Sequence, residues 1–223
     1  YHVSIKNHNN GALNDKAQFG QTIRSIMESK RARAAQKGRP IPDWQDEIDF
    51  LRDPKGNPMI AWPMTLFDCS PVSDGAAVAL LVSEEIAKTF TDMPIYLIGS
   101  GQASDGALPE RKTLSSIPAA EEAGRQAYQM ANLTPKDIDI AEVHDCFTIA
   151  EIIATEDLGF FERGTGWQAA IEGKTSRNGD RPINTSGGLK SKGHPVGATG
   201  IGQVVEIWKQ LNGIAGERQV QGD

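Results

Sequence analysis

The pattern of apolar and polar residues divides the chain into an irregular first part and a more regular second part. In the first part, residues 23–36 have the composition of a helix, and residues 3–5 form a short apolar run that predicts a strand. Prolines then interrupt the chain repeatedly, at Pro54, Pro58 and Pro63. We therefore expect residues 1–65 to form a linker or loop domain around a core rather than a compact unit.

From about residue 66 onward, strand-like and helix-like segments alternate. The strand-like segments are residues 78–82, 95–98 and 138–143. The helix-like segments are residues 84–90, 118–132, 147–158 and 201–211. The first strand-like segment is a nearly continuous branched apolar run, which is typical of a strand buried on both faces. This alternation predicts an α/β layered fold.

The composition narrows the class of protein. Of the 223 residues, 39% are hydrophobic and 23% are charged, which is typical of globular domains. The formal net charge of -6 argues against a nucleic-acid-binding protein, which needs cations to neutralise phosphates. No apolar run approaches the ~20 residues that cross a bilayer. The two cysteines do not make a disulfide framework, so we expect a reducing compartment and a cytoplasmic protein.

The first segment with candidate chemistry is DCSPVSDGAA, at residues 68–77. Its small residues permit a tight turn and close backbone packing at the entry to a strand. Cys69 lies in this turn, and two interpretations are open: a nucleophile, or a small buried apolar side chain. Free cysteines are among the most buried residues, so we favour the packing role for Cys69.

The second segment is EVHDCF, at residues 142–147, where a predicted strand meets the following helix. Reactive groups of α/β folds gather at such strand ends. His144 and Cys146 are two residues apart, so an extended backbone would point both side chains to the same side. The N-terminus of the following helix favours a thiolate at Cys146. Half of a zinc site and simple packing are the alternatives, but no second Cys/His pair has ligand spacing, and we expect no metal.

The third segment is NTSGGLKSKGHPVGATG, at residues 184–200, whose glycines let the backbone approach a ligand closely. His194 is held between Gly193 and Pro195, just before a predicted helix whose first N–H groups point back at the loop. A lone histidine is more often structural than catalytic, but this setting favours catalysis. The segment lacks the GKS or GKT ending of a P-loop, so nucleotide hydrolysis is not expected.

In their order and approximate spacing, the segments DCSPVSDGAA, HDCF and GGLKSKGHPVGATG resemble those of the thiolase family. The HDCF form resembles the branch that contains SCP2-type thiolases and archaeal acetoacetyl-CoA thiolases. The resemblance implies a thiolase-like layered α/β fold, with helices packed on mixed β-sheets, that is incomplete at both ends. Residues 1–65 would be the end of the N-terminal half and the loop domain. Residues 66–223 would be the C-terminal thiolase-like domain, lacking its last strand or strands.

The resemblance also implies the chemistry, which is reversible condensation of acetyl-CoA, or thiolysis of 3-oxoacyl-CoA, through a covalent acyl-cysteine. His194 matches the histidine that activates the nucleophilic cysteine and helps to bind a thioester oxygen. His144 stands where an oxyanion-hole residue is expected, and Cys146 matches a cysteine that serves as acid and base. The substrate-binding positions are expected in the glycine-rich segment, at Ser186, Gly187, Gly193 and Gly197. Coenzyme A thioesters are the substrates, and no separate cofactor is expected.

The nucleophilic cysteine of the family would lie upstream of Tyr1, so we expect this chain alone to be inactive. The resemblance implies an acyl-CoA substrate and a homodimer or homotetramer. An archaeal-like protein would also form a complex with HMG-CoA synthase and a zinc-containing OB-fold protein. Two other functions stay open: a non-catalytic thiolase-like subunit that scaffolds a partner enzyme, and an enzyme of decarboxylative condensation, against which the HDCF motif speaks.

Clustered cations have two interpretations. The family's loop domain binds the phosphates of coenzyme A, so the basic residues between Lys30 and Arg39 could steer an acidic substrate. An ordinary solvated helix face is the alternative. Lys190 and Lys192, close to His194 in the sequence, have the same two interpretations.

Overall fold

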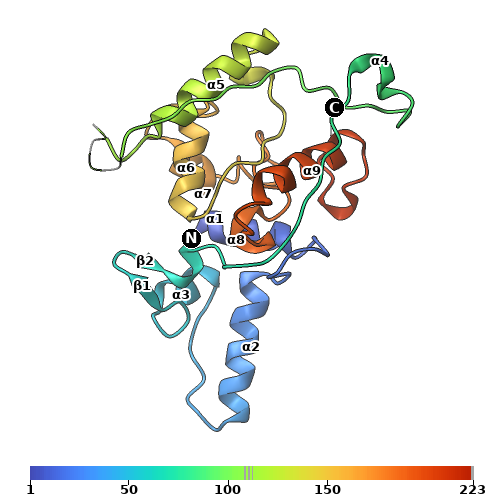
Figure 1. Ribbon diagram of the computed structural model, residues 1–223. Helices are drawn as coiled ribbons and strands as arrows, with labels where there is room; N and C mark the ends of the chain where they lie inside the picture. Colours follow the sequence, from blue (N-terminus) through green and yellow to red (C-terminus); the bar gives the residue numbers. More distant parts are fainter. Residues whose placement is uncertain (108, 110, 112, 222–223) are drawn as a thin grey trace.

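The fold is that of a computed structural model, which describes residues 1–107, 109, 111 and 113–221. Helices dominate it (Figure 1). The α-helices are α1 (His2–Gly11), α2 (Ile23–Gln36), α3 (Glu47–Arg52), α4 (Glu84–Ala87), α5 (Pro118–Ala131), α6 (Thr148–Asp157), α7 (Gly166–Ile171), α8 (Gly188–Lys192) and α9 (Thr199–Leu211). Short 3-10 turns are η1 (Leu66–Asp68), η3 (Pro135–Asp137) and η4 (Gly216–Arg218). The strands β1 (Met59–Ala61) and β2 (Met64–Thr65) form an antiparallel hairpin.

Helix α1 lies at the centre of the molecule, where it packs against α8, α2, α6 and α7. We predicted a strand at residues 3–5, and this prediction is wrong. Burial recurs along α1 at Val3, Asn7 and Asn10, which is the spacing of one face of a helix rather than the alternation of a strand. Most of that face is polar, so it carries no hydrophobic signal that could have identified the helix.

The apolar core lies in the first part of the chain, which we expected to be a linker or loop domain. Ile23 and Met27 of α2 pack there with four further buried side chains, those of Trp44, Phe50, Leu51 and Phe67. The rings of Trp44 and Phe50 meet edge to face, with their centroids 5.0 Å apart. Because Phe67 belongs to this cluster and α1 packs on α8, contacts cross the expected boundary at residue 65.

The helices of the second part agree well with the pattern of the sequence. Helix α5 spans Pro118–Ala131 and ends at Asn132, whose left-handed backbone stops it. Helices α6 and α9 span Thr148–Asp157 and Thr199–Leu211, close to their predicted bounds, whereas α4 is shorter than predicted. None of the helices in the described residues combines the length and the apolar character needed to cross a membrane.

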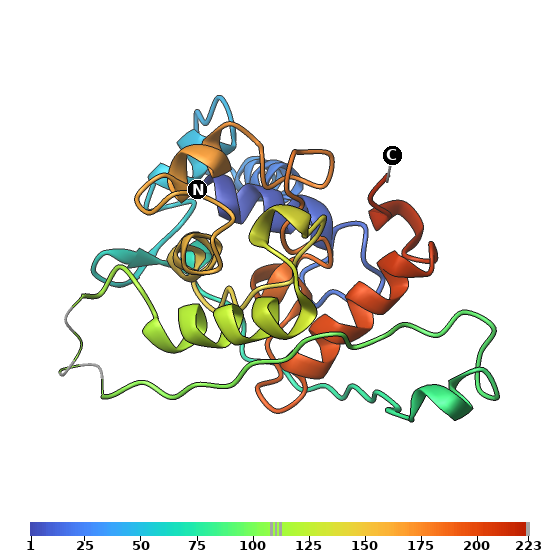
Figure 2. The same cartoon turned by 90° about the horizontal axis from the view of Figure 1, so that it is seen from above.

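The predicted strands at residues 78–82 and 95–98 do not form paired strands among the described residues. Val78 and Leu81 are 86% and 79% exposed, so the expectation of burial on both faces is wrong. The segment after α4 instead lies along α5, where Gln102 N–H donates to the Gln126 side chain at 3.1 Å (Figure 2). Residues 138–143 make one isolated bridge, between Ala141 and Ile183. A strand requires a neighbour for its backbone groups. Among the described residues, 78–82 and 95–98 have no such neighbour, and 138–143 have only the bridge at Ala141.

The buried His8 of α1 predicts a pH-dependent stability. Its Nδ1 donates to the Gln21 carbonyl at 3.0 Å, and its ring stacks on Phe19 and meets the Phe67 ring edge to face. Burial, with the charge of Lys190, lowers the pKa of His8 from 6.5 to about 4. The unfolded chain therefore binds a proton in this window that the folded chain does not. Stability should fall by up to about 3 kcal/mol as the pH drops from 6.5 to about 4.

Urea unfolding of the chain at a series of pH values measures this dependence. His8→Gln should flatten the dependence between these pH values. His2→Gln replaces an exposed histidine of the same helix whose pKa is also lowered by burial, and it should flatten the dependence less. If the free energy of unfolding depends on pH equally in the wild type and in His8→Gln, the lowered pKa assigned to His8 would be wrong.

Candidate active site

The three sequence motifs meet in the structure, because residues 68–77 run between the other two. The backbone N–H of Ser70 donates to the Cys146 carbonyl at 2.9 Å. Two residues further, Val72 forms a parallel bridge with His194. The hydroxyl of Ser73 then accepts from the His194 N–H at 2.6 Å. One extended segment thus holds the HDCF and GHP motifs side by side.

The rings of His144 and His194 are in contact. Their centroids are 5.0 Å apart and their planes are nearly perpendicular, at 82°. His144 is exposed and His194 is half-buried, so a ligand can reach this pair from solvent. Burial, and then the neighbouring His194, lowers the pKa of His144, which keeps its ring neutral at neutral pH. The structure therefore brings the two predicted histidines together.

The hydrogen bonds of His194 favour one tautomer. Its Nδ1 lies 2.9 Å from the hydroxyl oxygen of Thr199, and that hydroxyl donates to the Pro195 carbonyl at 3.1 Å. A hydroxyl has a single proton, so Thr199 must accept from Nδ1–H when it donates to Pro195. The lone pair of His194 then lies on Nε2, where it can accept a proton from a substrate or a thiol.

Cys146 lies directly before α6, but its environment differs from our expectation. Burial raises the pKa of the Cys146 thiol most strongly. The Phe147 N–H lowers that pKa by a smaller amount, and the charge of Asp145 raises it by less again. The prediction that the helix N-terminus favours a thiolate is therefore wrong in this setting, since burial of the thiol outweighs the helix. At neutral pH Cys146 carries a proton.

A network of five buried polar residues lies beneath these motifs, and we call it the α1 network: Lys6, Asn7, Asp145, Glu151 and Asn184. Asn7 Nδ2 donates to Asp145 Oδ2 and to Glu151 Oε2, both at 2.8 Å. Lys6 Nζ contacts Glu151 Oε1 at 2.5 Å, and Asn184 Nδ2 donates to Glu151 Oε2 at 2.8 Å. The network joins α1 to the HDCF motif, to α6 and to the glycine-rich segment.

Asp145 also anchors the start of α8. Its carboxylate accepts from the backbone N–H groups of Leu189, at 2.7 Å, and Lys190, at 3.3 Å. Gly188 has a positive φ of 59°, and a Cβ there would lie 2.2 Å from Asp145 Oδ2. Only glycine fits between this carboxylate and the helix. Burial and the charge of Glu151 raise the pKa of Asp145 to about 7.

The predicted substrate-binding positions divide into two groups. Ser186 and Gly187 are buried, and the Ser186 hydroxyl donates to Glu142 Oε2 at 2.5 Å. A Cβ on Gly187 would lie 2.6 Å from the Cα of Gly11, so the two backbones touch. These residues hold the loop against α1 and do not face solvent. Their role in binding substrate stays a prediction. Gly193 is buried beside Ser73, although it contributes to the lining of a groove, whereas Gly197 is exposed with open space around it.

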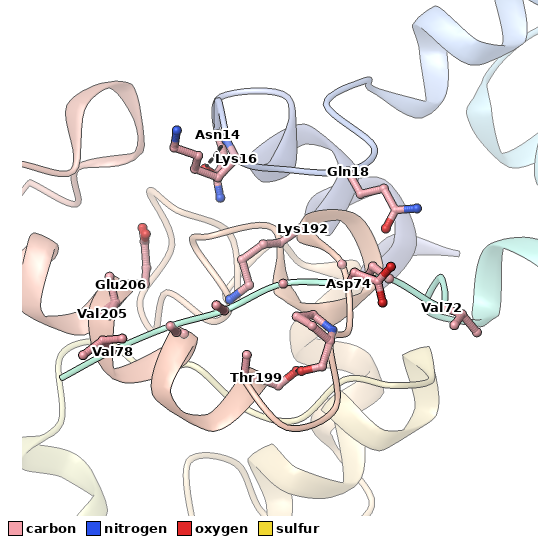
Figure 3. Close-up of a pocket in the computed structure, with 18 of the residues that line it drawn as sticks. Asn14, Lys16, Gln18, Val72, Asp74, Val78, Lys192, Thr199, Val205 and Glu206 are labelled. Atoms are coloured by element: carbon pink, nitrogen blue, oxygen red, sulfur yellow. Dashed lines mark hydrogen bonds between the residues drawn. The ribbon is translucent and has the colours of Figure 1, made fainter.

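A groove of about 700 Å³ lies beside the His194 loop. Figure 3 shows the segment from Val72 to Val78 crossing it, with Thr199 on one side of the segment. The other side holds Asn14, Lys16, Gln18, Lys192 and Glu206. Gly193, Pro195 and Thr199 line the groove next to His194. His144, His194 and Cys146 themselves lie outside its lining, so the groove adjoins the histidine pair without containing it.

The sequence analysis missed Ser73, Thr199 and Asp145, although each lies within a quoted motif. The candidate chemistry in these motifs was assigned to neighbouring histidines and cysteines. No local sequence signal distinguishes a hydroxyl or carboxylate that positions another residue from one that contacts only solvent. Cys69 Sγ contacts the Thr65 carbonyl at 3.4 Å, which agrees with the packing role. In the parts of the chain that the structure describes, no group of three metal-ligating side chains converges.

Comparison with known proteins agrees with this arrangement. The sequence model of the family described as "Thiolase C-terminal domain-like" matches residues 72–223. The chain belongs to the thiolase family. An acetyl-CoA acetyltransferase of Methanothermobacter thermautotrophicus is 44% identical over 223 residues, covering 99% of this chain and 51% of that protein. Sterol carrier protein 2 of Bos taurus is 40% identical over 230 residues, covering 99% of this chain and 37% of that protein. The thiolase-family chain thus spans about half the length of the first relative.

Two solved structures confirm the fold class. The Ltp2-ChsH2(DUF35) aldolase superposes with a TM-score of 0.72 at 24% identity, covering 96% of this chain and 50% of that chain. A monomeric SCP2-thiolase like protein type 1 from Mycobacterium smegmatis superposes with a TM-score of 0.53 at 17% identity. The superposition covers 97% of this chain and 45% of that chain. These likenesses confirm the thiolase-like architecture that the motifs predicted, although the described residues pair only β1 with β2 in a sheet.

Thr199 should control the tautomer of His194 in this thiolase-family chain. We expect the wild type to hold its proton on Nδ1 at neutral pH, because Thr199 accepts it. Thr199→Val removes the acceptor and should shift the ring toward the Nε2–H tautomer, whereas Thr199→Ser keeps the hydroxyl and should preserve Nδ1–H. Nitrogen-15 chemical shifts of the His194 ring measure the tautomer. A wild type that carries its proton mainly on Nε2 would contradict this assignment.

Proposed function

We propose that this protein transfers acyl groups between coenzyme A thioesters, by reversible acetyl-CoA condensation or 3-oxoacyl-CoA thiolysis. The observation that carries the proposal is the edge-to-face contact of His144 with His194, beside the half-buried Cys146. Membership of the thiolase family supports it, as does the similarity to acetyl-CoA acetyltransferases. The groove beside His194 supplies room for part of a thioester substrate.

Each site residue has a role in this proposal. His194, with its lone pair on Nε2, takes the proton of a nucleophilic thiol and then donates toward the thioester oxygen. His144 donates to the same developing oxyanion from the opposite ring. Cys146 enters the cycle as a thiol, returns its proton to the departing group and removes one from the acetyl α-carbon in the reverse direction. Both cysteine protonation states are used, so a thiol at rest suits the acid step.

The nucleophilic cysteine is proposed to lie outside these 223 residues. Cys69 is a poor candidate, because its thiol contacts the Thr65 carbonyl and lies beside Asp68. Burial, and then the charge of Asp68, raises the pKa of the Cys69 thiol. This chain alone would then hold the base, the oxyanion donor and the acid/base thiol, without catalysing the reaction by itself.

The basic helix α2 contributes fewer free cations than its sequence indicates. Lys30 Nζ donates to the Gly56 carbonyl at 2.6 Å and lies over the Phe50 ring. Arg31 donates to the Trp44 carbonyl at 3.0 Å. These two side chains hold α2 to its neighbours, so a role in steering coenzyme A phosphates falls to the exposed Arg33, Lys37 and Arg39.

The proposal predicts that Cys146 is needed for catalysis and that Cys69 is not. In the protein expressed from its complete reading frame, His194→Ala and Cys146→Ala should each lower kcat for acetoacetyl-CoA thiolysis by about 100-fold or more. Cys69→Ala is the matched control and should retain kcat within about threefold, because the Cys69 thiol only packs. Unchanged turnover in His194→Ala would exclude the proposed mechanism, and loss of turnover in Cys69→Ala alone would reassign the cysteine.

A partnered, non-catalytic subunit is the second candidate function. The observation that favours it is the likeness to Ltp2, which is assembled with ChsH2(DUF35) in the solved structure. For this protein, the proposed partners are a second copy in a homodimer or homotetramer, HMG-CoA synthase and a zinc-containing OB-fold protein. If the complete protein has no thiolysis activity alone and gains it only with such a partner, this second function is correct.

A further inference from the structure

Asp145 lies between His144 and Cys146, and the proposed function gives it no role. Its side chain is fully buried, and it ties two distant parts of the chain to the HDCF motif. On one side it accepts from Asn7 of α1 at 2.8 Å, and on the other it accepts from the Leu189 N–H of α8 at 2.7 Å. A buried carboxylate held by several donors has almost no rotational freedom, so the backbone that carries it is also fixed.

The side-chain amide of Asn7 directs its N–H groups at both carboxylates. Asn7 Nδ2 donates to Asp145 and Glu151 together, while Asn7 Oδ1 is buried without a hydrogen-bond partner. The opposite orientation would place Oδ1 against both carboxylates and would require a proton on each of them. In the observed orientation, both carboxylates receive an N–H hydrogen bond from Asn7, and the Asn7 Oδ1 is left without a partner.

The charged groups around Asp145 come from four elements. Glu151 of α6 and Glu142 of the HDCF segment repel its charge, whereas Lys6 of α1 and Lys190 of α8 attract it. Burial makes the charge costly, so the carboxylate gains a proton at a pH near neutrality rather than in acid. Cys146 is the next residue along the chain, and the charge of Asp145 raises the pKa of its thiol, although burial and the Phe147 N–H act more strongly.

We propose that Asp145 is a positioning residue for the acid/base cysteine, which its buried carboxylate holds in place and keeps as a neutral thiol. Asn7 and the start of α8 orient the carboxylate, and the carboxylate fixes the backbone of His144 and Cys146. The negative charge next to Cys146 disfavours the thiolate, so the thiol retains the proton that an acid must donate. The acid/base role of Cys146 rests on the proposed function, whereas the coupling of its protonation to Asp145 does not.

The test measures the reactivity of Cys146 directly, without enzymatic turnover. The complete protein is alkylated with iodoacetamide between about pH 6 and 9, and the rate at the Cys146 peptide is read by mass spectrometry. Asp145→Asn removes the charge and keeps the shape of the side chain. We expect the Cys146 rate below the thiol pKa to rise about three- to tenfold, because losing a nearby negative charge lowers that pKa by about half a unit to one unit.

Glu142→Gln is the matched control. Glu142 is also a buried carboxylate of the HDCF segment, but it binds Ser186 and lies 3.8 Å from Lys192 instead of adjoining Cys146. Its replacement should leave the alkylation profile of Cys146 within about twofold of the wild type. An equal rise in both variants, or no change in Asp145→Asn, would overturn the proposal and leave Asp145 a purely structural residue.

Two further measurements decide the matter if Asp145→Asn fails to fold. Asn7→Ala removes one donor from Asp145, which then keeps its proton to a higher pH, and the Cys146 rate should rise in the same direction. The wild type itself should show an alkylation rate that climbs less than tenfold per pH unit around pH 7, where Asp145 loses its proton. A constant tenfold slope through that range would overturn the proposal whatever the variants show.

Discussion

The fold and its site depend on the burial of two carboxylates, Asp145 and Glu151, in one polar network. An isolated buried charge costs far more than a typical protein can lose, so each carboxylate must have partners. Lys6 and Asn7 supply them from α1, and Asn184 supplies another from the glycine-rich segment. Helix α1 is therefore held at the centre of the molecule by polar contacts, while the apolar core lies to one side, around Phe50 and Phe67.

The site takes its geometry from this network. Asp145 fixes the backbone on both sides of itself, and by anchoring the start of α8 it also sets the path of the loop that carries His194. Ser73 and Thr199 then complete the placement of His194, through its backbone N–H and its ring. The contact between the two histidine rings is thus the outcome of interactions made mostly by residues that touch no substrate.

Part of the fold and of the candidate site could be predicted from the sequence, and part could not. The helix at residues 23–36 was predicted at its observed bounds from its helical composition, and the structure adds the Thr22 cap. The motifs identified His144, Cys146 and His194, because glycine, proline and a strand end leave local signals. The prediction of a strand at residues 78–82 was wrong, because the hydrophobic character of a segment does not reveal whether another strand is available to pair with it. The α1 network was invisible, because a contact between Asn7 and Asp145 leaves no local pattern.

The most direct test of the central claim is a double-mutant cycle on Lys6 and Glu151, measured by urea unfolding. Lys6→Met leaves a buried carboxylate without its cation, and Glu151→Leu leaves a buried cation without its carboxylate, so each should cost about 3–5 kcal/mol. The double variant replaces the pair by apolar groups and should cost at least about 2 kcal/mol less than the sum of the two single variants. Additive costs, or single variants that lose less than about 1 kcal/mol, would contradict the claim that this pair holds α1 beneath the site.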